Sequence, residues 1–111
     1  MNSHLISLDE ISWQPFGGQT KGLLRKSLSS VAFPSGFKGA VILAQAGGEF
    51  PEHIDPYGHI FYVLEGEGEF TVEKEKMNLK KESVLTVTAG KRHGYRNPGP
   101  GDLKLITLNI F

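Results

Sequence analysis

The residues best suited to chemistry in this chain are three histidines and one aspartate. His53 and His59 flank Asp55 within residues 47–66, and His93 lies in the C-terminal part of the chain. Imidazole and carboxylate together suit divalent first-row metals such as Mn, Fe, Co, Ni, Cu or Zn. The chain contains no cysteine, so nitrogen and oxygen would be the only ligands. Spacing alone leaves two interpretations open, a metal site and histidines that only fill a core.

Short strands must position these side chains. Residues i and i+2 of a strand lie on the same face, so His53 and Asp55 can point in one direction together. By the same alternation, His59, Phe61 and Val63 share one face of the next strand. Polar groups that lead into a buried strand indicate a site built inside a β scaffold.

Composition limits the class of protein. A chain of 111 residues is one domain, here residues 1–111, and 14 glycines favour many short strands joined by tight turns. Twelve basic and twelve acidic residues give a net charge of zero, so nucleic acid is an unlikely partner. The sequence has no run of 18 apolar residues and no basic-then-apolar leader, which predicts a soluble, cytoplasmic protein without a membrane partner.

The pattern along the chain predicts an all-β sandwich or barrel, a class that includes jelly rolls. We expect a short edge strand near residues 5–8, a strand over 23–33 and a turn at 34–36. Gly47 and Gly48 are expected to end the strand that starts at Gly39. The main strands are expected near 39–46, 59–65, 69–73, 83–88, 93–97 and 103–110, with no helix longer than about one turn.

Two stretches resemble the conserved motifs of the cupins. The first motif has a glycine, a His-x-His pair, a glutamate and a second glycine, and these positions are taken in register by Gly47, His53, Asp55, His59 and Gly66. The second motif has its positions at Glu82, Thr88, Gly90, His93 and Asn97, of which the last three match. The resemblance covers roughly residues 38–110 and implies a cupin jelly-roll β-barrel of two antiparallel sheets.

The resemblance also implies a ligand set. Cupins normally hold a metal with three histidines and one glutamate, and these positions become His53, Asp55, His59 and His93. Aspartate stands where the second histidine is usual, and histidine where glutamate is usual, so three imidazoles and one carboxylate are kept. The family includes dioxygenases, isomerases, decarboxylases and small-molecule sensors, and the fold does not choose among them. We expect a metal-dependent enzyme, of dioxygenase or isomerase type, for a small organic acid, phenol or sugar derivative; the alternative is a non-catalytic binding or sensing module.

Further residues are expected around the metal. Phe61, Tyr95, Asn97 and Gln45 are predicted to contact a small-molecule ligand, and Asp55 and Tyr95 to act in catalysis. For Phe61 the alternative is a core position, and for Asn97 it is a role in holding the turn before Pro98. Asp55 has three open roles: a direct ligand, a second-shell group that orients an imidazole or water, and a cap of the turn that follows it.

The outward face of the strand near 59–65 is also apolar. Ile60, Tyr62 and Leu64 point away from the predicted interior, and a strand that is apolar on both faces must be covered on both. A second copy of the chain is the simplest way to cover this outward apolar face, so we expect a homodimer.

Overall fold

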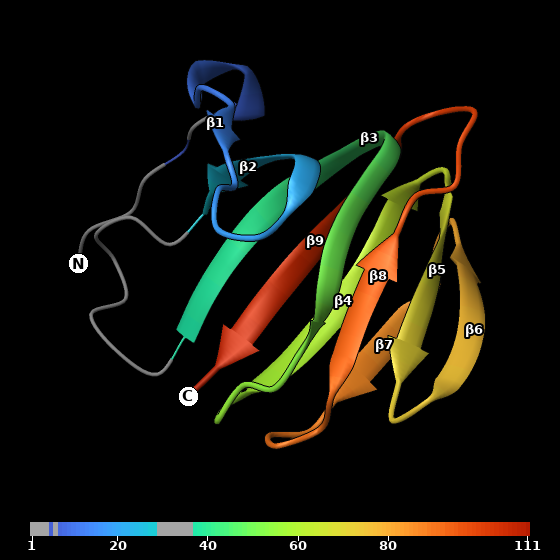
Figure 1. The fold of residues 1–111 in the computed structure, drawn as a ribbon. Helices are drawn as coiled ribbons and strands as arrows, with labels where there is room; N and C mark the ends of the chain where they lie inside the picture. Colours follow the sequence, from blue (N-terminus) through green and yellow to red (C-terminus); the bar gives the residue numbers. More distant parts are fainter. Residues whose placement is uncertain (1–4, 6, 29–36) are drawn as a thin grey trace.

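A computed structural model describes residue 5, residues 7–28 and residues 37–111 of the chain (Figure 1). Strands dominate these ranges, and one 3₁₀ turn is the only helix in them. The elements in chain order are η1 (Leu8–Glu10), β1 (Gln14–Pro15), β2 (Lys21–Ser27), β3 (Phe37–His53), β4 (Gly58–Glu65), β5 (Glu67–Val72), β6 (Glu75–Lys80), β7 (Val84–Val87), β8 (His93–Arg96) and β9 (Leu103–Ile110).

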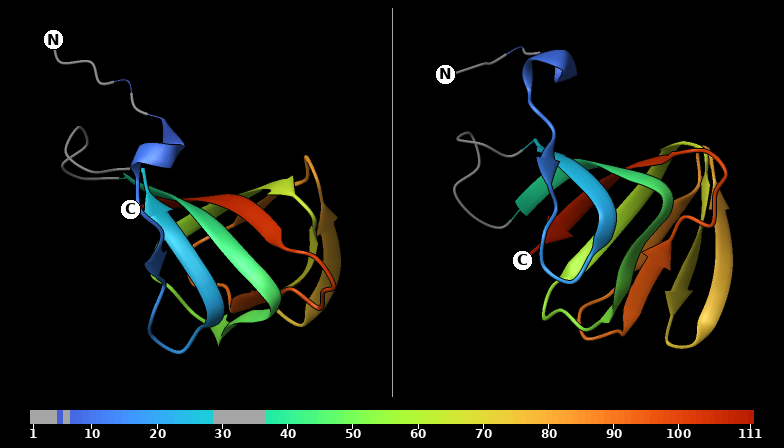
Figure 2. Two further views of the ribbon diagram at one scale, coloured as in Figure 1. Left: turned by 90° about the horizontal axis from the view of Figure 1, so that it is seen from above. Right: turned by 45° about the horizontal axis from the view of Figure 1, so that its top comes forward.

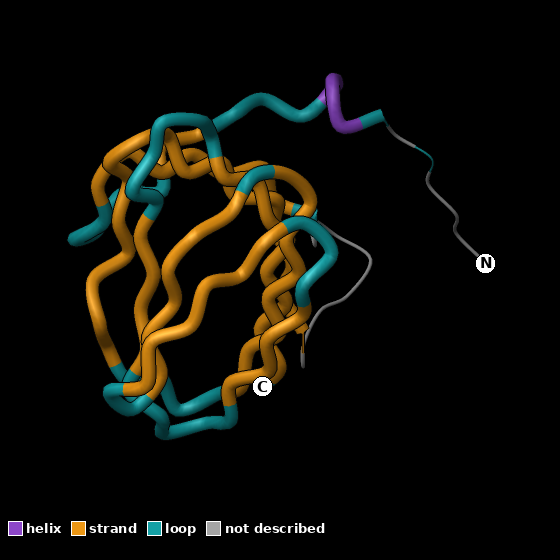
Figure 3. The backbone as a smooth tube through the Cα atoms, turned by 90° about the vertical axis from the view of Figure 1, so that its right-hand side faces the viewer, coloured by secondary structure: helices purple, strands orange, loops and turns teal. Residues whose placement is uncertain are grey.

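The strands form a nearly closed antiparallel barrel. The hydrogen-bonded order is β6-β5-β8-β3-β9-β4-β7, with β2 added to β3 and β1 to β2. The first half of β3 lies in the layer β2-β3-β9-β4-β7, and its second half pairs with β8 in the layer β8-β5-β6. Figure 2 shows the two layers curving toward each other, and Figure 3 shows loops joining the strands at both ends. The predicted all-β jelly-roll barrel is confirmed.

The long strand β3 connects the two layers through a bend at two glycines. Gly47 has a φ of +83°, a left-handed conformation that favours glycine. Its N–H donates to the carbonyl of Asn97 at 2.8 Å, and the N–H of Asn97 donates to the carbonyl of Gly48 at 2.8 Å. β3 pairs with β9 as far as Ala44 and with β8 from Glu49. The expectation that these glycines end the strand is therefore wrong, because they turn it onto a new partner.

The barrel interior is filled by the inward residues of both layers. The most buried large side chains include Ile42, Val63, Phe70, Leu103 and Leu105, each at most 1 % exposed. β4 shows the predicted alternation: His59, Phe61 and Val63 are buried, whereas Ile60, Tyr62 and Leu64 are partly exposed on the other face. The same alternation on β9 carries Leu103, Leu105, Thr107 and Asn109 along the inner face.

The N-terminal segment differs from expectation. Leu8 begins the 3₁₀ helix, with Ser7 as its N-cap, so the edge strand expected near residues 5–8 is wrong in its described part. Figure 1 shows this segment beside β2, outside the barrel. The strand expected over 23–33 is found as Lys21–Ser27; its remainder beyond Leu28, the turn at 34–36 and His4 fall outside the described residues. Within the described ranges, no helix has the length and apolar character needed to cross a bilayer.

Asn97 ties the bend of β3 to the loop that follows β8. Its side-chain Nδ2 donates to the carbonyls of Ala44 at 2.9 Å and Gly101 at 2.7 Å. Its side-chain Oδ1 accepts from the N–H of Gly99 at 2.9 Å. The side chain is 3 % exposed. Two of these contacts lie within the loop after β8, and the third joins this loop to β3.

Removing this side chain is expected to destabilise the fold. An Asn97→Ala protein loses three hydrogen bonds, at about 1 kcal/mol each, so we expect a loss of about 2–3 kcal/mol. Thermal denaturation followed by circular dichroism measures the change. Gln45→Ala, at a neighbouring exposed position, is the matched control and should leave the melting temperature unchanged. Equal melting temperatures for the two variants would contradict this role of Asn97.

Candidate metal centre

Three strand ends bring the predicted ligand residues together. His53 is the last residue of β3, His59 lies near the start of β4, and His93 is the first residue of β8. His53 and His93 are cross-strand partners in the β3–β8 pairing. Asp55 lies in the loop between β3 and β4, so all four residues lie at one end of the barrel.

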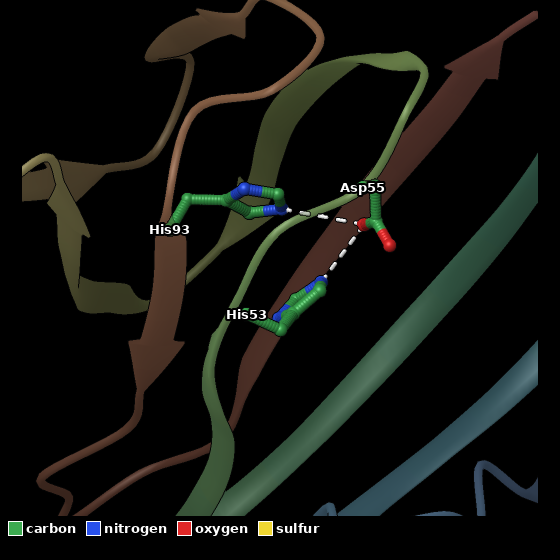
Figure 4. Close-up of side chains that lie close together, drawn as sticks. All are labelled: His53, Asp55 and His93. Atoms are coloured by element: carbon green, nitrogen blue, oxygen red, sulfur yellow. Dashed lines mark hydrogen bonds and ion pairs between the residues drawn. The ribbon is translucent and has the colours of Figure 1, made fainter.

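The carboxylate of Asp55 is the centre of the cluster. Its Oδ2 atom is 2.9 Å from Nε2 of His53, 2.9 Å from Nε2 of His59 and 3.7 Å from Nε2 of His93. His53, Asp55 and His93 each place one donor atom within 4.8 Å of the others, and His59 joins them through its contact with Oδ2. Figure 4 shows the side chains of His53 and His93 directed at Asp55 from two strands.

Each imidazole is oriented by a hydrogen bond from its other nitrogen. Nδ1 of His53 donates to the carbonyl of Pro51 at 2.9 Å, and Nδ1 of His93 donates to the carbonyl of Lys91 at 2.8 Å. Nδ1 of His59 donates to Oδ1 of Asn109 at 2.8 Å. A neutral imidazole protonated on Nδ1 carries a lone pair on Nε2. All three lone pairs therefore point into the cluster, which is the arrangement that ligand histidines adopt.

Three imidazole nitrogens converge on one carboxylate oxygen. With Nδ1 as the donor nitrogen, each Nε2 directs a lone pair at Oδ2 of Asp55, and Nε2 of the buried His93 has no hydrogen-bond partner. A cation bound between these atoms would provide that partner. Ligands about 2.1 Å from one metal ion lie roughly 3.0–3.4 Å apart for octahedral or tetrahedral angles. The observed separations of 2.9 and 3.7 Å bracket that range. The donor atoms of His53, Asp55 and His93 therefore fit a divalent metal, and His59 adds an imidazole beside Asp55.

The cluster forms one end of a cavity of about 480 Å³. Aromatic side chains make up much of its wall, and the ring of Phe50 stacks on His53 at 4.4 Å between centroids. The lining residues are Phe16, Arg25, Lys38, Phe50, His53, Asp55, Tyr57, His59, Phe61, His93, Tyr95, Thr107, Asn109 and Phe111. A cavity with aromatic walls and convergent polar groups is a form that small-molecule sites commonly take.

The predicted ligand-contacting residues divide into two groups. Phe61 and Tyr95 line the cavity, with their rings 5.7 Å apart. Gln45 is exposed and Asn97 is enclosed by backbone, and the structure brings neither to the cavity. Gln45 lies on the opposite face of β3 from Ala44, whose side chain belongs to the core.

Asn109 was missed by the sequence analysis. It lies directly opposite His59 in the β4–β9 pairing and fixes the orientation of that imidazole. The sequence pattern could have indicated Asn109, because the alternation that places Leu103 and Leu105 on the inner face continues to the polar residues Thr107 and Asn109. A polar residue at an inward position near a histidine strand is a candidate second-shell group.

Comparisons with known proteins agree with this architecture. The family model of the cupin domain matches residues 40–111. The chain belongs to the cupin family. The tetracenomycin polyketide synthase protein TcmJ of Streptomyces glaucescens is 38 % identical over 84 residues, which are 75 % of this chain and 54 % of that protein. The chain therefore spans about half the length of this curated relative.

Solved structures show the same cupin fold. A predicted oxalate decarboxylase from Thermotoga maritima superposes with a TM-score of 0.89 at 23 % identity, over 97 % of this chain and 99 % of the other. The polyketide cyclase RemF from Streptomyces resistomycificus gives a TM-score of 0.88 at 13 % identity, over 98 % and 80 %. At these identities the similarity shows the fold.

Burial shapes the protonation of this cupin cluster. Burial, and then the neighbouring imidazoles of His53 and His59, lower the pKa of His93 despite its backbone hydrogen bond and the charge of Asp55. His93 is therefore neutral near pH 7, the form that binds metal. Burial raises the pKa of the Tyr95 phenol, and partial burial followed by the charge and hydrogen bonding of Asp55 raises that of Tyr57. Both phenols stay protonated and can only act as hydrogen-bond donors or acceptors.

The lowered pKa of His93 predicts a pH-dependent stability of the metal-free protein. The unfolded chain binds a proton at His93 near pH ~6.5, whereas the folded chain does so only at lower pH. Above pH ~6.5, His93 is neutral in both states and does not reduce the free energy of unfolding. As the pH falls below this value, the unfolded chain takes up the proton first, so the free energy of unfolding decreases. We expect the melting temperature of metal-free protein to fall between pH 7.5 and about 5.5. Metal affinity should fall over the same range, because protons compete for the imidazoles.

A His93→Asn protein isolates this contribution, because asparagine does not titrate in this range. Its melting temperature should depend less on pH than that of the unmodified protein. Parallel curves for the two metal-free proteins would contradict the assignment to His93.

Proposed function

We propose that this cupin is a metal-dependent enzyme that acts on a phenolic or polyketide-like compound by proton transfer, an isomerase or cyclase type of reaction. The observation that carries the proposal is the convergence of three Nε2 atoms and one carboxylate oxygen at the end of an aromatic cavity. His53, His59 and His93 with Asp55 would hold the metal. When bound, the metal supplies Lewis-acid polarisation of a carbonyl or phenolate oxygen.

The cavity wall supports an unsaturated or aromatic substrate. The ring of Tyr57 lies 5.1 Å from His59 and 4.5 Å from Phe111, and Phe16 meets Phe50 edge-on at 5.1 Å. Aromatic pairs at such distances favour stacked and edge-to-face arrangements, which extend naturally to a planar ligand. The polyketide names of the relative TcmJ and the structural neighbour RemF agree with such a ligand.

Two residues of the chain have roles in proton transfer. Asp55 lies beside the imidazoles, and its carboxylate can accept a proton from the substrate and return it. Tyr95, which stays protonated, can donate a hydrogen bond to a substrate oxygen. In an intramolecular aldol closure, a proton leaves a carbon between two carbonyls and that carbon bonds to a further carbonyl carbon. The oxygen of that carbonyl then gains a proton. This reaction consumes no oxidant and no reductant.

The test begins with metal analysis of purified protein. The metal-loaded protein is then incubated with linear oligoketides and simple phenols, with and without O₂, and the products are identified by mass spectrometry. We expect products of unchanged mass, or of mass reduced by one water, in both atmospheres. An Asp55→Asn protein is the matched control and should give none.

Two other outcomes would contradict the proposal. Products that gain both atoms of O₂, formed only in air, would make the protein a dioxygenase, which the same ligand set can support. Saturable binding of the compounds with no product under either condition would favour a binding or sensing module.

We also propose that the protein is a homodimer. On the outer face of the barrel, Tyr62 lies opposite Ile106 on one side and Val84 on the other, and Ile60 lies opposite Leu108. Val84 is 62 % exposed, so this apolar surface continues to the sheet edge. Light scattering should give twice the chain mass of 12.2 kDa, and Tyr62→Glu should reduce it to one chain. A single-chain mass for the unmodified protein at micromolar concentration would contradict the dimer.

A further inference from the structure

Two basic residues line the cavity away from the metal cluster. Arg25 is on β2 and Lys38 is near the start of β3, and both contribute to the same cavity wall as His59 and Asp55. They also border a second cavity of about 620 Å³, which shares Phe16, Arg25, Lys38, Thr107 and Asn109 with the first and continues toward β1. Arg25 and Lys38 therefore lie where the metal-end cavity opens toward solvent.

Strand register directs both residues to the inner face. Arg25 is the cross-strand partner of Ile42, which is fully buried in the core. Lys38 is the partner of Asn109, and Asn109 is the partner of His59, so these three residues form one row across three strands. Directly opposed residues of neighbouring strands lie on the same face. The same alternation of inward and outward residues that builds the core thus places Arg25 and Lys38 on the inner face of the barrel wall.

Neither cation has an acidic partner. In the part of the chain that the structure describes, no ion pair or hydrogen bond involves the charged group of Arg25 or Lys38. Their contacts there are with rings: the Arg25 guanidinium carbon lies 5.1 Å from the centre of Phe16, and Lys38 Nζ lies 5.8 Å from that of Phe111. Asp55 is the one carboxylate in the cavity lining, and three imidazoles surround it. Within the described residues, the two cations at the cavity mouth are therefore not paired with a carboxylate.

We propose that the substrate is a carboxylate whose anionic end is bound by Arg25 and Lys38 while its other end reaches the metal cluster. This inference rests on the proposed function for the second contact. Lys38 and His59 are separated by two strand spacings, roughly 10 Å, so the ligand spans about the length of two fused rings. Phe16 and Phe111, which contact the two cations, flank its body. Arg25 and Lys38 are then specificity-determining residues that distinguish an acid from its neutral analogue.

The solvent-exposed position of both side chains offers a simpler explanation, namely cations that are only hydrated. Among the described residues, the exposed Lys74 and Lys81 also form no ion pair, whereas Arg96 is paired with Glu69 at 3.1 Å. The absence of a carboxylate partner alone therefore does not distinguish Arg25 and Lys38. Arg25 and Lys38 differ from these because they sit on inward positions and line a cavity. Cations at inward positions of a cavity wall can bind the anionic group of a ligand through charge-assisted hydrogen bonds.

The test compares one planar acid with its uncharged amide. Binding of 3-hydroxy-2-naphthoate and of 3-hydroxy-2-naphthamide is measured by fluorescence titration, with metal-loaded protein and with protein stripped by a chelator. The unmodified protein should bind the acid at least ~10-fold more tightly than the amide in both forms, because an anion held by two cations gains charge-assisted hydrogen bonds. The double variant Arg25→Gln with Lys38→Gln should lose this preference and bind the amide as before. The control, Lys74→Gln at the exposed β5–β6 turn, should keep the preference.

The outcomes separate this inference from the proposed function. A preference for the acid that disappears when the metal is removed would overturn the inference, since the metal alone would then hold the carboxylate. A preference that survives in the double variant would overturn it as well. A preference that persists without metal and requires Arg25 and Lys38 supports it, even if no compound is converted and the enzymatic proposal fails. Melting temperatures of all variants confirm that each protein is folded.

Discussion

A protein in which leucine replaces His93 is expected to purify with almost no bound metal, yet to be more stable than the unmodified protein once both are metal-free. The loss of metal follows from removing one of three imidazole ligands. The gain in stability follows because Nε2 of His93 is buried without a hydrogen-bond partner in the absence of a cation. A buried unsatisfied polar atom costs about 1–3 kcal/mol, and leucine has a similar size and no polar atom. Elemental analysis and thermal denaturation in chelator measure the two effects.

The opposite signs of these effects distinguish a ligand from a structural histidine. If His93 only filled the core, leucine would leave any bound metal in place, and that result would contradict the metal centre. His4→Ala serves as the control, because His4 is the one histidine outside the proposed ligand set. It should leave metal content and melting temperature unchanged.

Replacing Asp55 by alanine is expected to weaken metal binding by more than ~100-fold and to abolish turnover. Second-shell partners of metal sites typically contribute 10–100-fold, and a direct ligand contributes more. Oδ2 of Asp55 is the one atom that approaches all three Nε2 atoms, at 2.9, 2.9 and 3.7 Å, which favours direct ligation. Competition with a chelating dye measures the affinity, and the product assay measures turnover.

Other results for Asp55 would assign it another role. Metal that is retained while turnover is lost would make Asp55 a base next to the metal rather than a ligand. Retention of both, with only a lower melting temperature, would mean that Asp55 caps the Pro56–Gly58 turn. Asp55→Asn is the matched variant, since it keeps the shape of the side chain and removes its charge.

The residues of the metal cluster could be predicted from the sequence more completely than the residues of the cavity around it. His53, Asp55, His59 and His93 are chemically distinctive residues, and the cupin motif spacing placed them on neighbouring strand ends. The cavity residues Arg25, Lys38 and Asn109 lie outside the two motifs, on β2, at the far end of β3 and on β9. Their inward positions depend on the register of β2, β3 and β9, which spacing within a motif does not fix.

Glycine caused the clearest error in the predicted fold. A Gly-Gly pair after an apolar strand normally indicates its end. Here the left-handed φ of Gly47 turns β3 without ending it, and the two backbone hydrogen bonds to Asn97 hold the turn. Such a bend needs a partner far along the chain, so local sequence cannot distinguish it from a loop.

The position of β9 has a consequence for how the protein is made. This strand is synthesised after β3 and β4, yet it lies between them and pairs with both along most of its length. Until residues 103–110 have left the ribosome, β3 and β4 have a strand-wide gap between them, and their edges can pair with other chains. The ligand residue His59 also lacks Asn109, its orienting partner, until that moment. We therefore expect metal to be captured only after synthesis of β9, in a late and non-local folding step.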